Sequence, residues 1–241
     1  MTDEPRTDDE ARAADDARSG AVHSGEPRSG EAASGEADGP LPYATAARTL
    51  LRDTILRATD ELVAERSWAK VTMAEVARAA GVSRQTVYNE FGNRSDLALA
   101  YASWTGDQLL DEVERCVAEH RDDLQEACVA AFAVFLDLGA DHPLVRSINA
   151  SGDGGDLAAV IARDGVSVFE GATVRLAEIV GRTWPGIPPD AVAAVSEVLV
   201  RLAVSHLIQP ATSSEAAAAQ VVAVLGPYLA RLQTTATHRP G

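Results

Sequence analysis

Three helix-start signals within residues 72–93 constrain the fold of this chain more than any other feature of its sequence. Thr72 is followed three residues later by a glutamate, which is the pattern of a capping box at a helix N-terminus. Ser83 and Asn93 are capping residues of the same kind at the next two helix starts. Gly81 and Gly92 separate these segments, and glycine is free to take the positive φ that ends a helix. The segment therefore predicts short helices joined by tight turns.

Helical periodicity continues on both sides of this segment. Leu51, Ile55, Ala58 and Leu62 form one apolar stripe of a helix expected from Tyr43 to near residue 67. No stretch shows the alternation of apolar and polar residues that is typical of a strand. Aromatic residues make up only 5% of the chain, so small aliphatic side chains must fill the core. The sequence predicts an all-α fold, with longer helices at 94–119, 122–139, 143–149, 156–183, 190–208 and 214–233.

The helix expected after Ser83 has two chemically different sides. Arg84 and Tyr88 stack at i, i+4, with Gln85 and Asn89 beside them, whereas Val87 and Phe91 point the opposite way. Arginine forms paired hydrogen bonds with guanine, and glutamine or asparagine with adenine, in the DNA major groove. The helix–glycine–helix spacing fits a helix-turn-helix. The alternative is a helical corner whose polar residues only face water.

Charge is unevenly spread along the chain. The formal net charge is −15, which argues against a protein coated with basic residues for nucleic-acid binding. Residues 41–94, however, carry eight basic and six acidic residues, so a slightly basic island coincides with the helix-turn-helix. Arg48, Thr72 and Arg94 lie near helix starts in this island and are expected to contact flanking phosphates. The full set of predicted DNA contacts is Arg48, Thr72, Ser83, Arg84, Gln85, Thr86, Tyr88, Asn89 and Arg94.

The string TMAEVARAAGVSRQTVYNEFGNRSDL (72–97) resembles the helix-turn-helix of TetR-family transcriptional regulators. The resemblance covers residues 46–97 at the level of the motif. It implies a three-helix DNA-binding domain at 43–92 and a helical ligand-binding and dimerisation bundle at 93–235. It also implies a regulator, most often a repressor, that binds a palindromic operator as a homodimer and is released by a small effector. The residues of this chain that match the family pattern are Thr72, Val76, Ala77, Ala80, Gly81, Val82, Ser83, Thr86, Tyr88, Phe91 and Arg94.

Two positions depart from the family pattern. Glu90 stands where a residue compatible with phosphate is common, so its carboxylate is expected to turn away, to pair with a nearby arginine, or to accept from cytosine N4. Ser67 replaces the usual glycine after the first helix, and Trp68 follows as the expected aromatic residue. The string YNEFG (88–92) is similar to a subgroup of actinobacterial regulators associated with alkane and fatty-acid metabolism.

The family resemblance places the effector among the middle helices, roughly 94–183. The apolar character of this region predicts a hydrophobic effector, such as a fatty acid or an acyl thioester. The candidate ligand-binding residues are three wall residues, Phe132, Phe135 and Phe169, and three polar handles, Asn149, Arg175 and His206.

The last two helices resemble the family's usual dimer interface. Each has an apolar stripe, and the alternative is that these stripes pack only within one subunit. The stripes consist of Val195, Val198, Leu199, Leu202 and Ala203 in one helix, and Ala218, Val221, Leu225, Tyr228 and Leu232 in the other.

Enzymes form a competing class, and so do helical adaptors or ligand-binding proteins that do not bind DNA. The five histidines and two cysteines match no metal-binding or nucleophile motif, so we expect no catalytic residue, no metal and no cofactor. Residues 1–40 are acidic, lack aromatic residues and are expected to be disordered. The most apolar stretch, 191–208, is interrupted by charged or polar residues, so we expect a cytoplasmic protein that does not enter the membrane.

Overall fold

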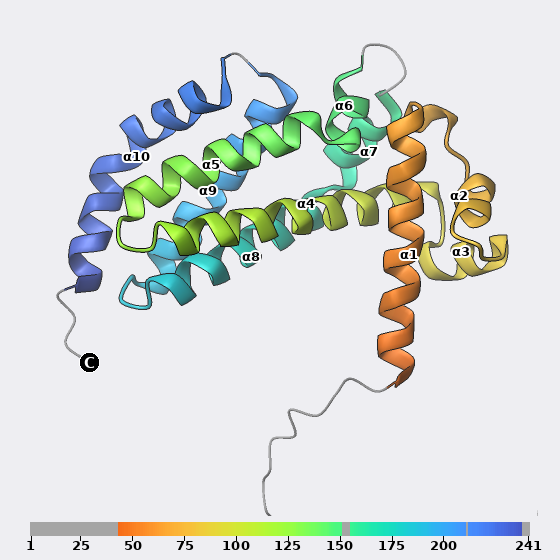
Figure 1. Cartoon of the computed structure of the whole chain (residues 1–241), viewed down its shortest axis with the longest axis horizontal. Coiled ribbons are helices and arrows are strands. Elements are labelled where there is room, and N and C mark those ends of the chain that lie inside the picture. Colours follow the sequence, from red (N-terminus) through yellow and green to blue (C-terminus); the bar gives the residue numbers. More distant parts are fainter. Residues whose placement is uncertain (1–42, 151–154, 211, 238–241) are drawn as a thin grey trace, which may run out of the picture. The chain divides into compact units, whose positions relative to one another are not determined.

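A computed structural model describes residues 43–150, 155–210 and 212–237, and every regular element in those ranges is a helix (Figure 1). They belong to one compact unit, 41–241, whereas the acidic tail predicted at 1–40 lies outside the described residues. The α-helices are α1 (Tyr43–Glu65), α2 (Met73–Ala79), α3 (Arg84–Phe91), α4 (Arg94–Glu119), α5 (Leu124–Asp141), α6 (Pro143–Asn149), α7 (Gly155–Asp164), α8 (Val166–Thr183), α9 (Pro189–Ile208) and α10 (Ser214–Thr237), with a 3₁₀ turn, η1 (Trp68–Lys70), after α1.

The predicted helix starts of the N-terminal segment are confirmed. Thr72 caps α2, and its hydroxyl accepts from the Glu75 amide while the Glu75 carboxylate accepts from the Thr72 amide, which completes a capping box. The side chains of Ser83 and Asn93 cap α3 and α4 by accepting hydrogen bonds from backbone amides in the first turn of each helix. The two predicted glycine turns are also confirmed, because Gly81 and Gly92 have φ of 69° and 75°.

A hydrophobic core joins α1, α2 and α3 to the first turns of α4. Ile55, Val76 and Val87 are fully buried, and Trp68 stacks on Tyr101 of α4 with ring centres 6.5 Å apart. We call α1, η1, α2, α3 and the first turns of α4 the head. Because α4 takes part in this core and then continues into the helical bundle, the head and the bundle share one helix. This continuous structure does not test the domain limits expected at 43–92 and 93–235, and they stay predictions.

The turn after α1 closes without the glycine that the family usually has there. Ser67 has φ −55° and ψ 143°, an ordinary extended conformation, and its hydroxyl accepts from the Ala69 amide at 3.4 Å. The 3₁₀ turn η1 follows at once and buries Trp68 in the head. The 3₁₀ turn η1 was not predicted from the sequence, since three residues are too few to show a periodicity.

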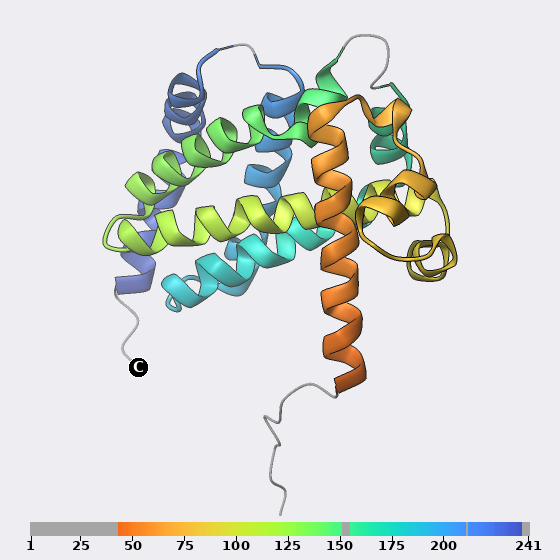
Figure 2. The same cartoon turned by 45° about the vertical axis from the view of Figure 1, so that its right-hand side comes forward.

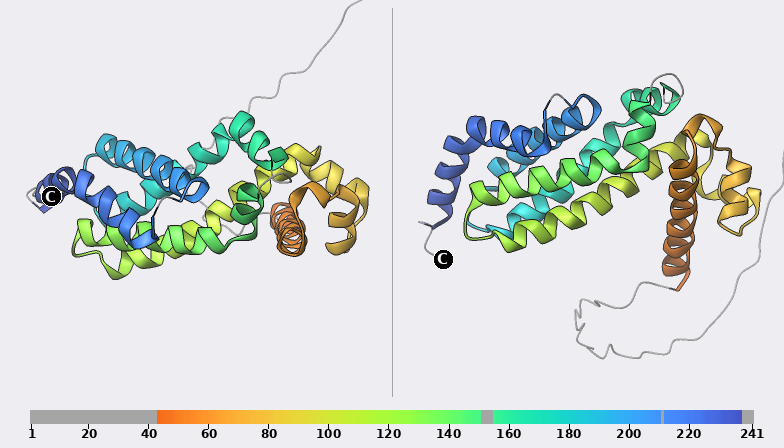
Figure 3. Two further views of the ribbon diagram at one scale, coloured as in Figure 1. Left: turned by 90° about the horizontal axis from the view of Figure 1, so that it is seen from above. Right: turned by 45° about the horizontal axis from the view of Figure 1, so that its top comes forward.

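The bundle is built on α4 and α5, which are joined by a short connection and lie antiparallel (Figures 1 and 2). Helix α8 packs on α4, α10 packs on α5, and α9 packs on both α8 and α5 (Figure 3). Helix α9 is long and apolar enough to cross a membrane, but its buried residues belong to the bundle core. The mostly apolar run in α5 is likewise explained by burial between neighbouring helices.

The single helix predicted at 156–183 is wrong, because the chain breaks at Gly165 into α7 and α8. A Cβ atom at Gly165 would lie 2.2 Å from the carbonyl oxygen of Ile161. Only glycine permits this close approach of the two backbones, so the residue serves the bend. The apolar periodicity continues across the bend, which is why the sequence pattern did not reveal it.

Candidate nucleic-acid interface and effector cavity

Helix α3 presents the four predicted base-reading side chains on its exposed side. Arg84, Gln85, Tyr88 and Asn89 are all exposed, whereas the apolar side chains on the opposite face are buried. The amide nitrogen of Gln85 donates to the amide oxygen of Asn89 at 2.7 Å, which holds the two side chains side by side. The arrangement provides a guanidinium, a phenol and two aligned amides on one surface, the groups that direct readout of base edges uses.

The remaining two polar residues at the start of α3 act within the helix. Ser83 accepts from the Thr86 amide at 3.0 Å, and the two hydroxyls lie 2.8 Å apart. Both hydroxyls therefore fix the N-terminus of the helix. Their predicted contacts with DNA stay predictions.

Glu90 is paired with arginine, which is the second of the three arrangements expected from the sequence. Its carboxylate accepts from Arg48 Nε at 3.0 Å and from Arg52 Nη1 at 2.8 Å, and its side chain is only 9% exposed. Burial opposes ionisation, but the hydrogen bonds from Arg52 and Arg48 outweigh it and hold the pKa of the carboxyl below its ordinary value. The carboxylate is thus neutralised inside the head rather than presented to a phosphate.

Replacing Glu90 with glutamine is expected to tighten binding to DNA of any sequence. The amide still accepts a hydrogen bond, but Arg48 and Arg52 regain a net positive charge on the side of the head that carries α3. The slope of log affinity against log salt should steepen by about one for each regained phosphate contact. Fluorescence anisotropy with a random duplex at several NaCl concentrations measures this slope.

The control for this variant is Glu119→Gln, which makes the same change of charge at the far end of α4. It should leave the slope unchanged. Equal slopes for Glu90→Gln and the unmodified protein would show that Arg48 and Arg52 do not face the phosphates.

Arg94 is held by contacts within the protein, and its predicted contact with a phosphate stays a prediction. Its guanidinium donates to the carbonyl oxygens of Val71 at 3.1 Å and Trp68 at 2.5 Å, and lies over the indole ring of Trp68 at 4.7 Å. These contacts close η1 onto the first turn of α4. Arg94 is a structural clamp of the head.

Thr72 is engaged in a similar way. Its hydroxyl donates to Glu75 at 2.7 Å, and its amide donates to the same carboxylate at 3.0 Å. These bonds lower the pKa of the Glu75 carboxyl. The observed role of Thr72 is helix capping, and a phosphate could be bound only by exchange with Glu75.

Four polar contacts connect the head to the bundle. Tyr101 donates to Asp60 at 2.5 Å, and Trp104 donates to Asp53 at 2.8 Å, so α4 holds α1 at two points. His142 at the start of α6 lies 3.8 Å from Asp60. From α6, the hydroxyl of Ser147 accepts from the Trp68 amide at 3.2 Å. These contacts tie α4 and α6 to α1 and η1.

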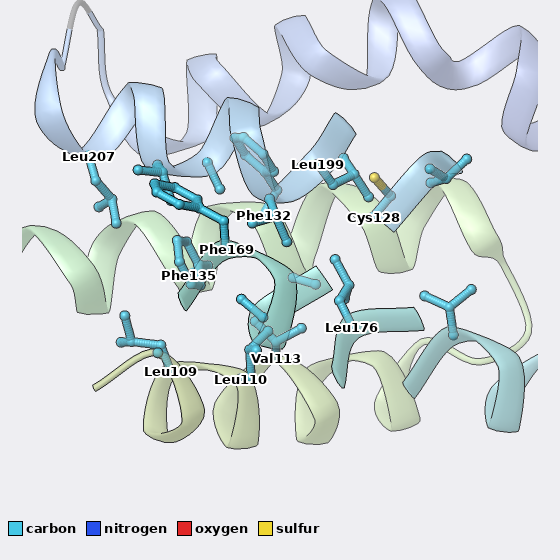
Figure 4. Close-up of a pocket in the computed structure, with 18 of the residues that line it drawn as sticks. Leu109, Leu110, Val113, Cys128, Phe132, Phe135, Phe169, Leu176, Leu199 and Leu207 are labelled. Carbon is cyan, nitrogen blue, oxygen red and sulfur yellow. The ribbon is translucent and has the colours of Figure 1, made fainter. Parts of the chain in front are cut away.

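The bundle contains a cavity of about 190 Å³ between α4, α5, α8 and α9 (Figure 4). Phe132, Phe135 and Phe169 line it, as the sequence analysis expected of wall residues. Leu110 and Val113 of α4 line the same space, so helix α4 carries both the cavity wall and the contacts with α1.

The three predicted polar handles are not among the described residues that line this cavity, and their contact with a ligand stays a prediction. Asn149 donates to the Leu207 carbonyl at 2.9 Å, and His206 lies edge-on to Phe132 with ring centres 6.0 Å apart. Arg175 instead forms ion pairs with Asp107 and Asp111 of α4. The polar groups of Asn149 and Arg175 thus have partners within the protein, and only long-range packing determined which ones.

One polar residue that lines the cavity, Thr105 of α4, was not predicted from the sequence. It lies on the same wall as Ala102, Gly106 and Leu109. These residues recur at i, i+3, i+4 and i+7, so the helical face was visible in the sequence. The sequence did not indicate that the cavity lies against this face of α4 rather than another.

Five of the ten residues in the two stripes expected to form a dimer interface are buried inside the subunit, and the interface itself stays a prediction. Val195, Ala203, Ala218, Val221 and Leu232 are buried in the bundle. The large apolar side chains that α9 and α10 leave exposed are Val198, Ile208 and Val224.

Comparisons with known proteins agree with this architecture. Residues 55–101 match the model for bacterial regulatory proteins of the tetR family, and residues 123–227 match the C-terminal domain model of the bacterial tetracycline repressor. The HTH-type transcriptional regulator AlkX of Mycobacterium tuberculosis is 36% identical over 191 residues, which cover 79% of this chain and 90% of the relative.

Solved structures give the same result. The TetR-family repressor AlkX from Dietzia sp. strain DQ12-45-1b, implicated in biodegradation of n-alkanes, superposes with a TM-score of 0.69 at 29% identity, covering 76% of this chain and 96% of that one. A TetR-family regulator from Pectobacterium atrosepticum shares the fold at a TM-score of 0.55 and 19% identity, covering 78% of this chain and 96% of that one. With a helix-turn-helix head, a helical bundle and matches over both, this chain belongs to the TetR family of bacterial transcriptional regulators.

Proposed function

We propose that this protein is a repressor that binds a palindromic operator as a homodimer, works in the cytoplasm and is released by a small hydrophobic effector. The observation that carries the proposal is the exposed face of α3. Arg84, Gln85, Tyr88 and Asn89 project from one side of a helix that is anchored by buried Val87 on the other. A helix whose polar side is exposed and whose apolar side is buried inserts into a major groove without losing its packing contacts.

A second candidate function, an adaptor that does not bind DNA, depended on repulsion between Glu90 and the phosphates. The ion pairs of Glu90 with Arg48 and Arg52 remove most of that repulsion. DNA binding is therefore the better supported of the two functions.

The proposed dimer joins α9 and α10 of two subunits. The support is family membership together with the apolar side chains of Val198, Ile208 and Val224, which are 42%, 44% and 74% exposed in the single chain. Two heads on one palindrome double the base contacts and set the spacing of the half-sites.

Replacing Val224 with glutamate is expected to weaken dimerisation by at least about 30-fold, because a carboxylate would be buried without a partner at the interface. Analytical ultracentrifugation over a range of protein concentrations measures the change. Val174→Glu on α8 is the matched control, since Val174 is also exposed, at 58%, but lies outside the proposed interface. A Val224→Glu protein as dimeric as the control would place the interface elsewhere.

The effector is proposed to bind in the cavity and to act through α4 and α6. Leu144 and Ile148 of α6 line the cavity, and Ser147 between them holds the Trp68 amide. A ligand that prefers a different position of α4 or α6 would shift the heads away from the spacing that DNA requires. The likeness to a repressor implicated in n-alkane biodegradation supports an effector with an alkyl chain.

Selection of bound fragments from random DNA by the purified full chain tests the proposal. We expect an inverted repeat whose half-sites lie about one or two helical turns apart. The selected duplex should then shift in a gel as a complex of two subunits. Failure to enrich any sequence, with protein that is folded by circular dichroism, would favour the adaptor.

A further inference from the structure

The chemistry of the cavity wall restricts the kind of molecule that it accepts. No described residue that lines the cavity is acidic or basic, and among them only Thr105, Cys128 and Trp184 have an oxygen, sulfur or nitrogen atom in the side chain. The indole nitrogen of Trp184 already donates to the Arg121 carbonyl at 2.9 Å. Burial raises the pKa of the Cys128 thiol to about 11, so it carries no charge at neutral pH.

Thr105 differs from two other helical threonines, the buried Thr59 and the partly buried Thr183. Thr59 donates its hydroxyl to the Ile55 carbonyl at 2.8 Å, and Thr183 donates to Ile179 at 2.9 Å. Thr105 is 1% exposed, and its hydroxyl has no hydrogen-bond partner among the described residues. A buried hydroxyl without a partner is costly, and a ligand that pairs with it removes that cost.

We infer that the cavity takes an uncharged aliphatic alcohol, whose hydroxyl pairs with Thr105 and whose chain lies against the phenylalanine rings. The inference rests on the proposed function, because it names the effector class of the same cavity. A carboxylate would lose its hydration without gaining a cationic partner, whereas an alcohol both donates to and accepts from a threonine hydroxyl. This class replaces the fatty acid and the acyl thioester expected from the sequence.

The volume of the cavity guides the choice of a test compound. A cavity of about 150 Å³ holds benzene, so the cavity of about 190 Å³ accommodates roughly eight non-hydrogen atoms. 1-Heptanol has that size, and heptanoate is the matched carboxylate.

The experiment compares 1-heptanol with heptanoate by isothermal titration calorimetry on the full chain at pH 7.5. We expect 1-heptanol to bind at least tenfold more tightly. Thr105→Val, which keeps the shape and removes the hydroxyl, should weaken 1-heptanol binding about five- to tenfold, and Thr105→Ser should restore most of it. Thr105→Val should not lower the melting temperature, because it removes a hydroxyl that has no partner in the described structure.

Thr59→Val is the matched control, since Thr59 is equally buried but belongs to α1 and does not line the cavity. It should leave both affinities unchanged. Heptanoate binding as tight as 1-heptanol binding, or a Thr105→Val affinity equal to that of the unmodified protein, overturns the inference while the cavity keeps its proposed effector role. Binding of neither compound overturns both.

Discussion

Alanine in place of Arg84 is expected to weaken operator binding by between about 30-fold and about 10⁴-fold. A bidentate contact with guanine contributes about 1–3 kcal/mol, and a homodimer loses it twice, about 2–6 kcal/mol in all. Arg84 is exposed and caps no helix, so the substitution should not alter the fold. Anisotropy titrations on the selected operator and on a random duplex measure the loss of affinity, which should be larger for the operator than for the random duplex.

Two companion variants make this result specific. Arg115→Ala removes the same charge from an exposed position in the second half of α4 and should leave operator affinity nearly unchanged. Tyr88→Phe removes only a hydroxyl and should cost less than Arg84→Ala. If Arg84→Ala bound the operator as tightly as Arg115→Ala, α3 would not be the reading helix.

Alanine in place of Trp68 is expected to destabilise the protein by about 3–5 kcal/mol, the usual cost of deleting a large buried aromatic side chain. Trp68 is 1% exposed, stacks on Tyr101 and supports the guanidinium of Arg94. Its removal therefore opens a cavity and also releases the clamp between η1 and α4. Urea unfolding at a fixed protein concentration measures the change in the free energy of unfolding.

Trp104→Ala is the comparison for this variant. Trp104 is only partly buried and donates one hydrogen bond to Asp53, so its loss should cost clearly less. A Trp68→Ala protein as stable as Trp104→Ala would mean that the head does not depend on the indole at position 68.

The two helices that line the cavity and also hold the head give the proposed allostery a physical route. Tyr101 and Thr105 lie one turn apart on α4, the first bonded to Asp60 of α1 and the second at the cavity wall. A ligand that moves the wall moves the same rigid helix that positions the head. The bend at Gly165 separates α7 from α8, which carries Phe169 of the wall.

Local features of the molecule were predictable from the sequence because they depend on neighbours within about one helical turn. The capping box at Thr72, the positive φ of Gly81 and the opposed faces of α3 follow from spacings of three or four residues. The exposure of Arg84 and the burial of Val87 follow from the same periodicity. No tertiary contact is needed to specify them.

Only the tertiary structure determined the partners of the polar groups. Glu90 lies 42 residues from Arg48 in the chain, and Arg94 reaches a carbonyl 26 residues away, so no local pattern encodes either contact. Thr105 and Thr59 look alike in sequence, yet the Thr59 hydroxyl bonds its own helix, whereas the Thr105 hydroxyl has no partner among the described residues. Long-range packing decides which polar groups are satisfied internally and which are left for DNA or a ligand, because that choice depends on which helices meet.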